Sequence, residues 1–208
     1  VTLHDGTYPF MFARNIYVDG LVSDSKYIFQ YCENVEIHHA KITTKDSFWE
    51  CENVTVYDSE LDGEYLAWHS KNVRLVNCHL KGEQLLCYVD NLKLENCTFD
   101  AECDRIFEYS TVEADIRGHV ENIKNPTSGH IVADSIGSIT IDKNVTINTN
   151  AKVWFGRTAV TKEVHATDVI INGTINQQKN TDTNSYGIMQ IQSDKGSTVT
   201  LNGTIYLD

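Results

Sequence analysis

The stretch Lys71-Asn72-Val73-Arg74-Leu75-Val76-Asn77-Cys78-His79-Leu80 decides the fold, because its pattern recurs at a fixed interval on both sides. Each of these stretches carries an asparagine that follows the preceding one by 19 residues, which gives the series Asn15, Asn34, Asn53, Asn72 and Asn91. An apolar residue, a variable one and another apolar one come after each of these asparagines. A repeat of such regular length predicts stacked, equivalent turns of a solenoid.

The repeat length selects the kind of solenoid. Nineteen residues leave no room for a pair of helices, and the apolar residues alternate with period two, as in a strand with one buried face. The multi-leucine consensus of leucine-rich repeats is absent, and periods of five or six residues do not divide 19. We therefore predict an all-β fold, a right-handed single-stranded parallel β-helix. Equivalent side chains should stack about 4.8 Å apart, and Asn72 should be a buried member of an asparagine ladder.

One domain is predicted for the whole chain, residues 1–208, because a solenoid has no single globular core. Regular rungs are expected over residues 8–111 and longer, irregular rungs over residues 112–208. Apolar anchors at Val112, Ile139, Val169 and Val199 predict rungs of 27 and then 30 residues. The polar run over residues 176–185 is expected to leave the body as a loop.

Charge and cysteine usage limit the possible partners. The formal charge of −12, from 17 basic and 29 acidic side chains, argues against nucleic acid and anionic membranes as partners. No apolar run is long enough to span a bilayer, and no signal peptide is found. The repeat places Cys32 beside Cys51 and Cys78 beside Cys97 at inward positions, which favours six free thiols in a reducing compartment. We expect a cytoplasmic protein without metal or cofactor, or a secreted one if a leader preceding Val1 has been removed.

A further group of motifs resembles a known family. They are Ser47-Phe48-Trp49-Glu50-Cys51, Tyr65-Leu66-Ala67-Trp68-His69, Phe107-Glu108-Tyr109-Ser110 and Ala133-Asp134-Ser135. Over roughly residues 27–142 the chain resembles an uncharacterised bacterial β-helix family catalogued as domain of unknown function 3737. The resemblance implies a β-helix and a cytoplasmic bacterial origin, and it implies no activity, because none is established for the family.

The segment before each asparagine carries the candidate site. We expect it to be a second strand, with the residues two, four and six positions before the asparagine, such as Trp49 and Trp68, facing inward. The residues three, five and seven positions before should face outward and form an aromatic stripe, which usually marks an interface or a ligand groove. Aromatic rings beside carboxylates suit sugar binding. The predicted ligand-binding residues are Tyr27, Tyr31, Phe48, Tyr65, Tyr88 and Glu108.

Catalytic roles are predicted for three residues of the same face. Glu50 and His69 should be neighbours in one column, about 5 Å apart at Cα, where the carboxylate would orient the imidazole as a general base. Asp46 would supply the second carboxylate that glycosidic cleavage usually requires. The residue set of polygalacturonases, which share the pectin-lyase-like fold class, is not present, and the near absence of Lys and Arg from the aromatic columns argues against a calcium-dependent pectate lyase.

The sequence leaves three functions open and does not decide whether the protein is an enzyme. The aromatic stripe could bind a ligand, with carbohydrate favoured. It could instead belong to a glycan-cleaving or glycan-modifying enzyme, or serve as the interface of a structural homo-oligomer.

Overall fold

The structure is a computed structural model that describes residues 1–140 with their side chains, and the backbone of residues 153–165, 169–176, 200–202 and 205–206. Regular structure in these residues consists of strands alone. The described part of the chain contains no helix that is long and apolar enough to cross a membrane. The strands are β1 (Thr2–Leu3), β2 (Arg14–Asp19), β3 (Val22–Ser23), β4 (Glu33–His38), β5 (Lys41–Thr43), β6 (Glu52–Tyr57), β7 (Glu60–Asp62), β8 (Lys71–Val76), β9 (His79–Lys81), β10 (Asp90–Phe99), β11 (Thr111–Ile116), β12 (His119–Lys124), β13 (Ser128–Val132), β14 (Ser135–Thr140), β15 (Val153–His165), β16 (Val169–Asn176), β17 (Thr200–Asn202) and β18 (Ile205–Tyr206).

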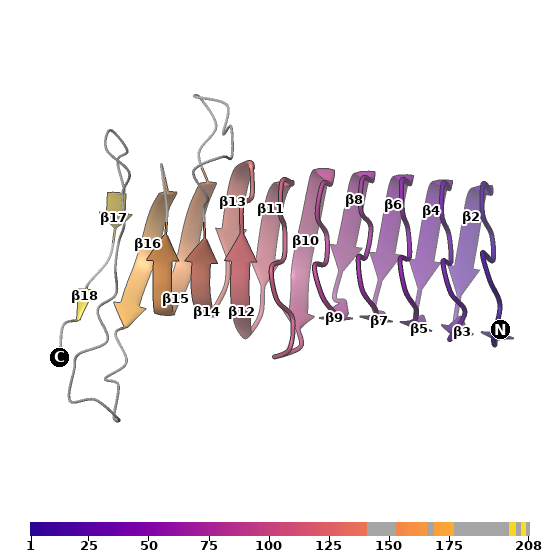
Figure 1. The fold of residues 1–208 in the computed structure, drawn as a ribbon, viewed down its shortest axis with the longest axis horizontal. Helices are drawn as coiled ribbons and strands as arrows, with labels where there is room; N and C mark the ends of the chain where they lie inside the picture. The colour runs from indigo at the N-terminus through magenta and orange to yellow at the C-terminus, as the bar shows by residue number, and fades with distance from the viewer. Residues whose placement is uncertain (141–152, 166–168, 177–199, 203–204, 207–208) are drawn as a thin grey trace.

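These strands form a parallel β-solenoid of about 7 turns, which confirms the predicted fold. The strands that follow the asparagines, β2, β4, β6, β8 and β10, pair in parallel and lie side by side along the rod (Figure 1). Their register joins equivalent repeat positions, so that Val35 pairs with Val54 and Val54 with Val73. Shorter strands, β3, β5, β7 and β9, form a second parallel series.

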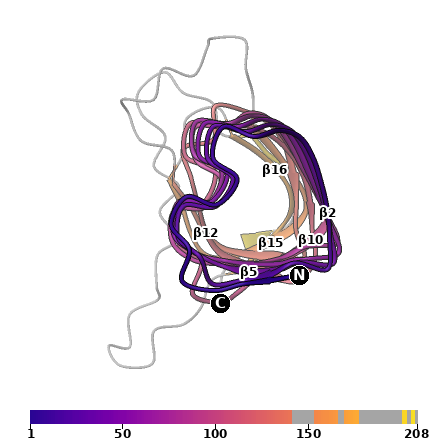
Figure 2. The same cartoon turned by 90° about the vertical axis from the view of Figure 1, so that its right-hand side faces the viewer.

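The solenoid is right-handed. Figure 2 looks from the N-terminal end, and there the chain runs clockwise as it recedes, first along β2 and then along the shorter strands. A turn segment, for example residues 24–32 between β3 and β4, completes each rung and leads back to the next long strand. In the same view this segment bends toward the inside of the solenoid.

The asparagine ladder is present at the corner between the turn segment and the long strand. Each side-chain amide donates to the Oδ1 of the asparagine one rung before it, at 2.8–2.9 Å, from Asn34 to Asn91. All five asparagines have positive φ angles between 54° and 62°, a region that asparagine tolerates better than most residues. The predicted burial of Asn72 is wrong, because Asn72 is half-buried and its ladder neighbours are exposed.

The turn segments are not the second strands that the sequence predicted. Every other residue in them has positive φ, as at Tyr27, Phe29 and Tyr31, with φ of 60°, 58° and 57°. Their amides bond alternately to the two neighbouring rungs: Tyr27 and Tyr31 donate to the following rung, at Lys45 O and Trp49 O, and Phe29 donates to the preceding rung. The alternating φ therefore bends the backbone inward while it stays hydrogen-bonded on both sides.

Cysteine and serine side chains support these bends from inside the core. The thiol of Cys51 donates to the carbonyl oxygen of Phe29 at 2.7 Å, and the hydroxyl of Ser70 donates to that of Phe48 at 2.5 Å. The same two side chains also accept the amides of the preceding rung, Cys32 N–H and Cys51 N–H. All six cysteines are free and buried. Small inward side chains with a donor thus satisfy backbone groups that the bend would otherwise leave unpaired.

The later rungs differ from the predicted lengths. Val112 pairs with Gly129, 17 positions later, and Ile131 pairs with Phe155, 24 positions later. The predicted rung of 27 residues from Val112 to Ile139 is wrong, because Ile139 belongs to another series and pairs with Ile123. The predicted rung of 30 residues from Ile139 to Val169 is also wrong, because Ile139 pairs with Val164, whereas the 30-residue spacing predicted from Val169 onward is present, since Ile171 pairs with Leu201. The loop predicted over residues 176–185 lies outside the described residues beyond Asn176.

Candidate functional site

Three columns of side chains cover the outside of the turn segments. We call them the leading, middle and trailing columns, in the order in which the chain meets them in each rung. The leading column consists of Tyr8, Tyr27, Asp46, Tyr65, Gln84 and Arg105. The middle column consists of Met11, Gln30, Trp49 and Trp68, and the trailing column of Phe12, Tyr31, Glu50, His69, Tyr88 and Tyr109.

Rings in the trailing column stack along the rod. Their centroids are 5.0 Å apart between Phe12 and Tyr31, 4.6 Å between His69 and Tyr88, and 5.1 Å between Tyr88 and Tyr109. Because the planes are nearly parallel, neighbours cover the ring faces, and the edges point to solvent. Tyr31, Tyr88 and Tyr109 nevertheless remain 37–40% exposed.

The middle column fills the space between the other two. Trp68 contacts Tyr65 of the leading column edge-on at 4.7 Å and Tyr88 of the trailing column at 5.1 Å. Its indole N–H donates to the carbonyl oxygen of Gln84 at 2.6 Å, and Gln30 donates in the same way to that of Asp46 at 3.1 Å. Trp49 does not share this bond, since its indole N–H is directed to Glu50 Oε1 at 3.4 Å. Trp49 is therefore held less firmly than its neighbours.

Both aromatic columns are interrupted in the same turn segment. Asp46 replaces a ring between Tyr27 and Tyr65 in the leading column, and Glu50 replaces one between Tyr31 and His69 in the trailing column. We call Asp46, Trp49 and Glu50 the carboxylate rung. Tyr31 stacks on Phe12 alone among the described residues, so the face that it turns toward Glu50 carries no ring.

Asp46 is the unusual carboxylate of the pair. Its Oδ1 atom is buried and has no hydrogen-bond partner among the described residues. Burial raises the pKa of the Asp46 carboxyl, and the charge of nearby Lys45 lowers it to a smaller extent. The Lys45 ammonium pairs with Glu64 at 3.2 Å and lies 5.6 Å from the centre of the Tyr65 ring. The site thus contains one carboxylate oxygen whose capacity to accept a hydrogen bond is unused among the described residues.

Glu50 and His69 occupy adjacent rungs of the trailing column, and both are exposed, as predicted. They do not form the predicted pair, because the hydrogen bonds among the described residues include none between them. The His69 ring stacks on Tyr88 and also lies 5.9 Å from Trp49. His69 therefore provides an aromatic surface beside the carboxylate rung.

Comparison of the chain with known protein families identifies one that matches most of its length. A family model described as "Protein of unknown function (DUF3737)" matches residues 1–154. The chain belongs to this family. No curated protein matches the chain, and no solved structure matches it. The match extends beyond the resemblance over residues 27–142 at both ends, and the family description assigns no activity.

Two of the residues predicted to bind the ligand, Phe48 and Glu108, are not on the surface. Phe48 is 1% exposed and stacks on Phe29 inside the core, with ring centroids 5.3 Å apart. The inward bend places the middle one of the three positive-φ residues in the core and the other two outside. Glu108 is 7% exposed and pairs with Lys124 at 3.1 Å. Of the remaining predicted contacts, Tyr31 and Tyr88 are exposed, and Tyr27 and Tyr65 are half-buried.

Three aromatic residues of the face were missed. Trp49 and Trp68 were expected to face inward, and both are half-buried in the middle column. Tyr109 takes the position expected for Glu108, because the rung before β11 has extra residues and lacks the corner asparagine. The stacking of Tyr109 on Tyr88 joins residues 21 positions apart. The alternation of aromatic residues in Phe107-Glu108-Tyr109 was the available signal.

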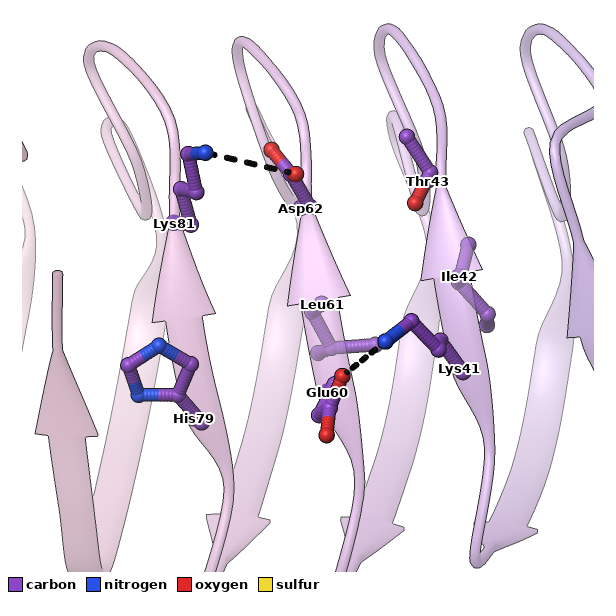
Figure 3. A pocket seen from close by; sticks show the side chains of 8 residues that line it. All are labelled: Lys41, Ile42, Thr43, Glu60, Leu61, Asp62, His79 and Lys81. Carbon is purple, nitrogen blue, oxygen red and sulfur yellow. Dashed lines mark ion pairs between the residues drawn. The ribbon is translucent and has the colours of Figure 1, made fainter.

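The strand face beside the turn segments offers a different surface. Figure 3 shows a hollow of about 180 Å³ over β5, β7 and β9, where Lys41 pairs with Glu60 at 2.7 Å and Lys81 with Asp62 at 3.9 Å. Its charges are matched within the hollow itself.

The described residues contain no group of three or more His, Cys, Asp or Glu side chains arranged to hold a metal ion.

Proposed function

We propose that the protein binds carbohydrate on the turn-segment face and that the carboxylate rung is the centre of the site. The interruption of both aromatic columns in one turn segment supports this proposal. Sugars are bound in proteins by ring faces that pack on C–H groups and by polar groups that bond the hydroxyls. The rings of the trailing column stack in two groups, Phe12 with Tyr31 and His69 through Tyr109, and between the groups, at Glu50, a face of Tyr31 has no ring against it.

Polar groups at this level complement the rings. The buried Oδ1 of Asp46 accepts no hydrogen bond, so a rotation of the half-buried carboxyl group that brings this oxygen to a ligand hydroxyl would remove an existing cost. Glu50 is exposed and carries the second carboxylate, while Trp49 presents a half-buried indole between them. Two acceptors around an aromatic surface match a neutral ligand with several hydroxyl groups.

Binding can be tested by substitution around the rung. The wild-type protein should bind neutral glycans on an array, and the best of them should then be titrated by calorimetry. Tyr31→Ala and Glu50→Gln should each weaken binding by about 1–2 kcal/mol, through lost ring contact and a weaker acceptor. Tyr17→Ala is the control, since Tyr17 is 67% exposed on the long-strand face. Equal weakening by Tyr17→Ala, or no glycan bound, would overturn the proposal.

A second candidate function is glycoside cleavage, which the environment of Asp46 favours. Such reactions commonly pair a protonated carboxylic acid with an ionised carboxylate. Burial raises the pKa of Asp46, and Glu50 follows four residues later on the same face. Incubation of the bound glycan with the protein should then release reducing ends, and Asp46→Asn should abolish the release while binding persists. If His69→Ala lowers affinity and no cleavage occurs, the protein is a binding protein.

Assembly through the same face gives a third result. If the stripe is an interface, Tyr88→Ala should change the sedimentation coefficient, and no glycan should bind.

We propose that the protein is located in the cytoplasm. The six buried free thiols support this compartment, because free thiols persist in a reducing environment.

A further inference from the structure

A second hollow lies beside the carboxylate rung, at the corner between the short strands and the turn segments. It has a volume of about 340 Å³, and its lining includes Lys26, Thr43, Lys45, Asp62, Gly63 and Gly82. Two glycines in successive rungs create it, since neither fills the corner with a side chain. A Cβ on Gly63 would lie 1.5 Å from the carbonyl oxygen of Thr44, so the close approach of the backbones requires glycine there.

This corner hollow adjoins the carboxylate rung. Lys45 lines the hollow and directly precedes Asp46, and Glu64 directly precedes Tyr65 in the next rung. The Lys45 ammonium reaches over the Tyr65 ring, 5.6 Å from its centre, and thus lies on the boundary between hollow and rung. A ligand that occupies the rung can extend over this boundary without crossing another ring.

Extension along the rod is blocked. Above and below the rung the trailing column is closed by stacked rings, with Phe12 on Tyr31 and His69 on Tyr88 at 5.0 and 4.6 Å. A bound chain must therefore run along the rung, perpendicular to the rod axis. A hollow of about 370 Å³ on the other side is lined by Asn15, Asn34 and Asn53. Their amides are already bonded to each other in the ladder.

The corner hollow has donors and acceptors that suit sugar hydroxyls. The ammonium of Lys26 is exposed and forms no ion pair or hydrogen bond with any residue in 1–140. Asp62 and Glu64 supply acceptors, and both are already paired with lysines, at 3.9 and 3.2 Å. The lining holds two lysines, Lys26 and Lys45, and three carboxylates, Asp24, Asp62 and Glu64, and this mixture of both signs of charge favours a neutral ligand over a strongly charged one.

We propose that the corner hollow is a second subsite, and that the ligand is a neutral oligosaccharide of at least two sugar residues lying along the rung, perpendicular to the rod axis. One sugar lies at the carboxylate rung, and the next sugar lies over Gly63 and Gly82, where Lys26 donates hydrogen bonds to its hydroxyl groups. This inference rests on the carbohydrate-binding function proposed above. It adds that affinity depends on chain length and on a residue outside the aromatic columns.

The test measures affinity against chain length. Cello-, malto- and β-1,4-galacto-oligosaccharides of one to four residues are titrated by calorimetry against the wild-type chain. For the series that binds, the affinity should rise about tenfold from the monosaccharide to the disaccharide. This is the gain expected when the second sugar makes one well-placed set of hydrogen bonds. Lys26→Ala should reduce this gain to about threefold or less. Thr43→Trp should remove it by filling the hollow, while leaving the affinity for the single sugar unchanged.

Lys71→Ala is the matched control, because Lys71 is likewise exposed and forms no side-chain ion pair in the described residues. It should leave the gain with chain length unchanged. Equal affinity for one and two residues, or a gain that survives both Lys26→Ala and Thr43→Trp, would overturn the second subsite and leave the proposed function standing. If no member of the three series binds, both proposals fail.

Discussion

Asp46 combines two properties that single carboxylates on a solenoid surface do not usually share. It stands where the leading column otherwise has a tyrosine, and its Oδ1 atom is buried without a donor. An unpaired buried polar atom costs free energy in the folded state, so this position is less stable than a ring would make it. The arrangement is typical of a residue kept for binding a ligand rather than for folding.

The pH dependence of stability tests this account of Asp46. Burial raises the pKa of Asp46 in the folded protein, so the charged form is penalised there. The penalty is fully present above the folded pKa and disappears as the pH falls through that value toward the ordinary value near 3.8. Asp46→Asn removes the charge and should raise the free energy of unfolding at pH 7 by about 1 kcal/mol, the lower end for a buried unpaired group.

Denaturant unfolding of the wild type and the variant at pH 7 and pH 3.5 measures this effect. The gain should shrink at the lower pH, because the wild-type carboxyl is then largely protonated. Asp90→Asn is the control at an exposed aspartate and should change stability little at either pH. A gain that is equal at both pH values would show that charge at Asp46 is not the cause.

At the scale of elements, the turn segment determines which aromatic residues are surface and which are core. Phe48 has a φ of 56° and points inward, between Asp46 and Glu50, which share positive φ and remain on the outside. Each such residue costs roughly 1–3 kcal/mol of backbone strain. Ring stacking, the hydrogen bonds between rungs and the cysteine and serine donors offset this cost.

Paired substitutions test the assignment of core and surface. Phe48→Ala should lower the free energy of unfolding by about 3–5 kcal/mol, because a fully buried ring leaves a cavity. Tyr88→Ala should lower it by about 1 kcal/mol, because the ring is 38% exposed and mainly loses stacking contacts. Chemical denaturation of both variants provides the comparison. Similar losses would mean that the trailing column is chiefly structural, which would weaken the case for a binding face.

The sequence predicts the long strands well and the turn segments poorly, for a physical reason. After its corner asparagine the long strand β6 has no further residue with positive φ, so that period two assigns Val54 and Val56 to the core directly, and both are buried. In the turn segments the same alternation of residue types accompanies alternating signs of φ, which nothing in the composition reveals. The error moved Phe48 to the surface and Trp49 to the core. The aromatic columns and their carboxylate interruption could still be read from the 19-residue spacing.

At the scale of the whole molecule, the solenoid is a one-dimensional stack in which each rung contacts its neighbours. Stability is then a sum of rung and interface contributions, and it can differ along the rod. Within residues 1–140 the first rung is poorly covered: Phe10 is 40% exposed, whereas Phe29 and Phe48 in the same column are 0–1% exposed. The six buried cysteines are distributed between Cys32 and Cys103 and can report this gradient.

Thiol labelling should therefore proceed in order along the chain. Burial raises the pKa of Cys87 to about 12 and that of Cys103 to about 11, so little reactive thiolate forms at these two positions in the folded state, whereas hydrogen bonding with Cys51 lowers the pKa of Cys32. In low denaturant with iodoacetamide, peptide mapping should find Cys32 labelled first and Cys103 markedly later, because opening of a rung is required for each reaction. Full unfolding without reductant should give six adducts, as expected for free thiols. Simultaneous labelling of all six would instead show that the described rungs open as one cooperative unit, and fewer adducts would reveal a disulfide.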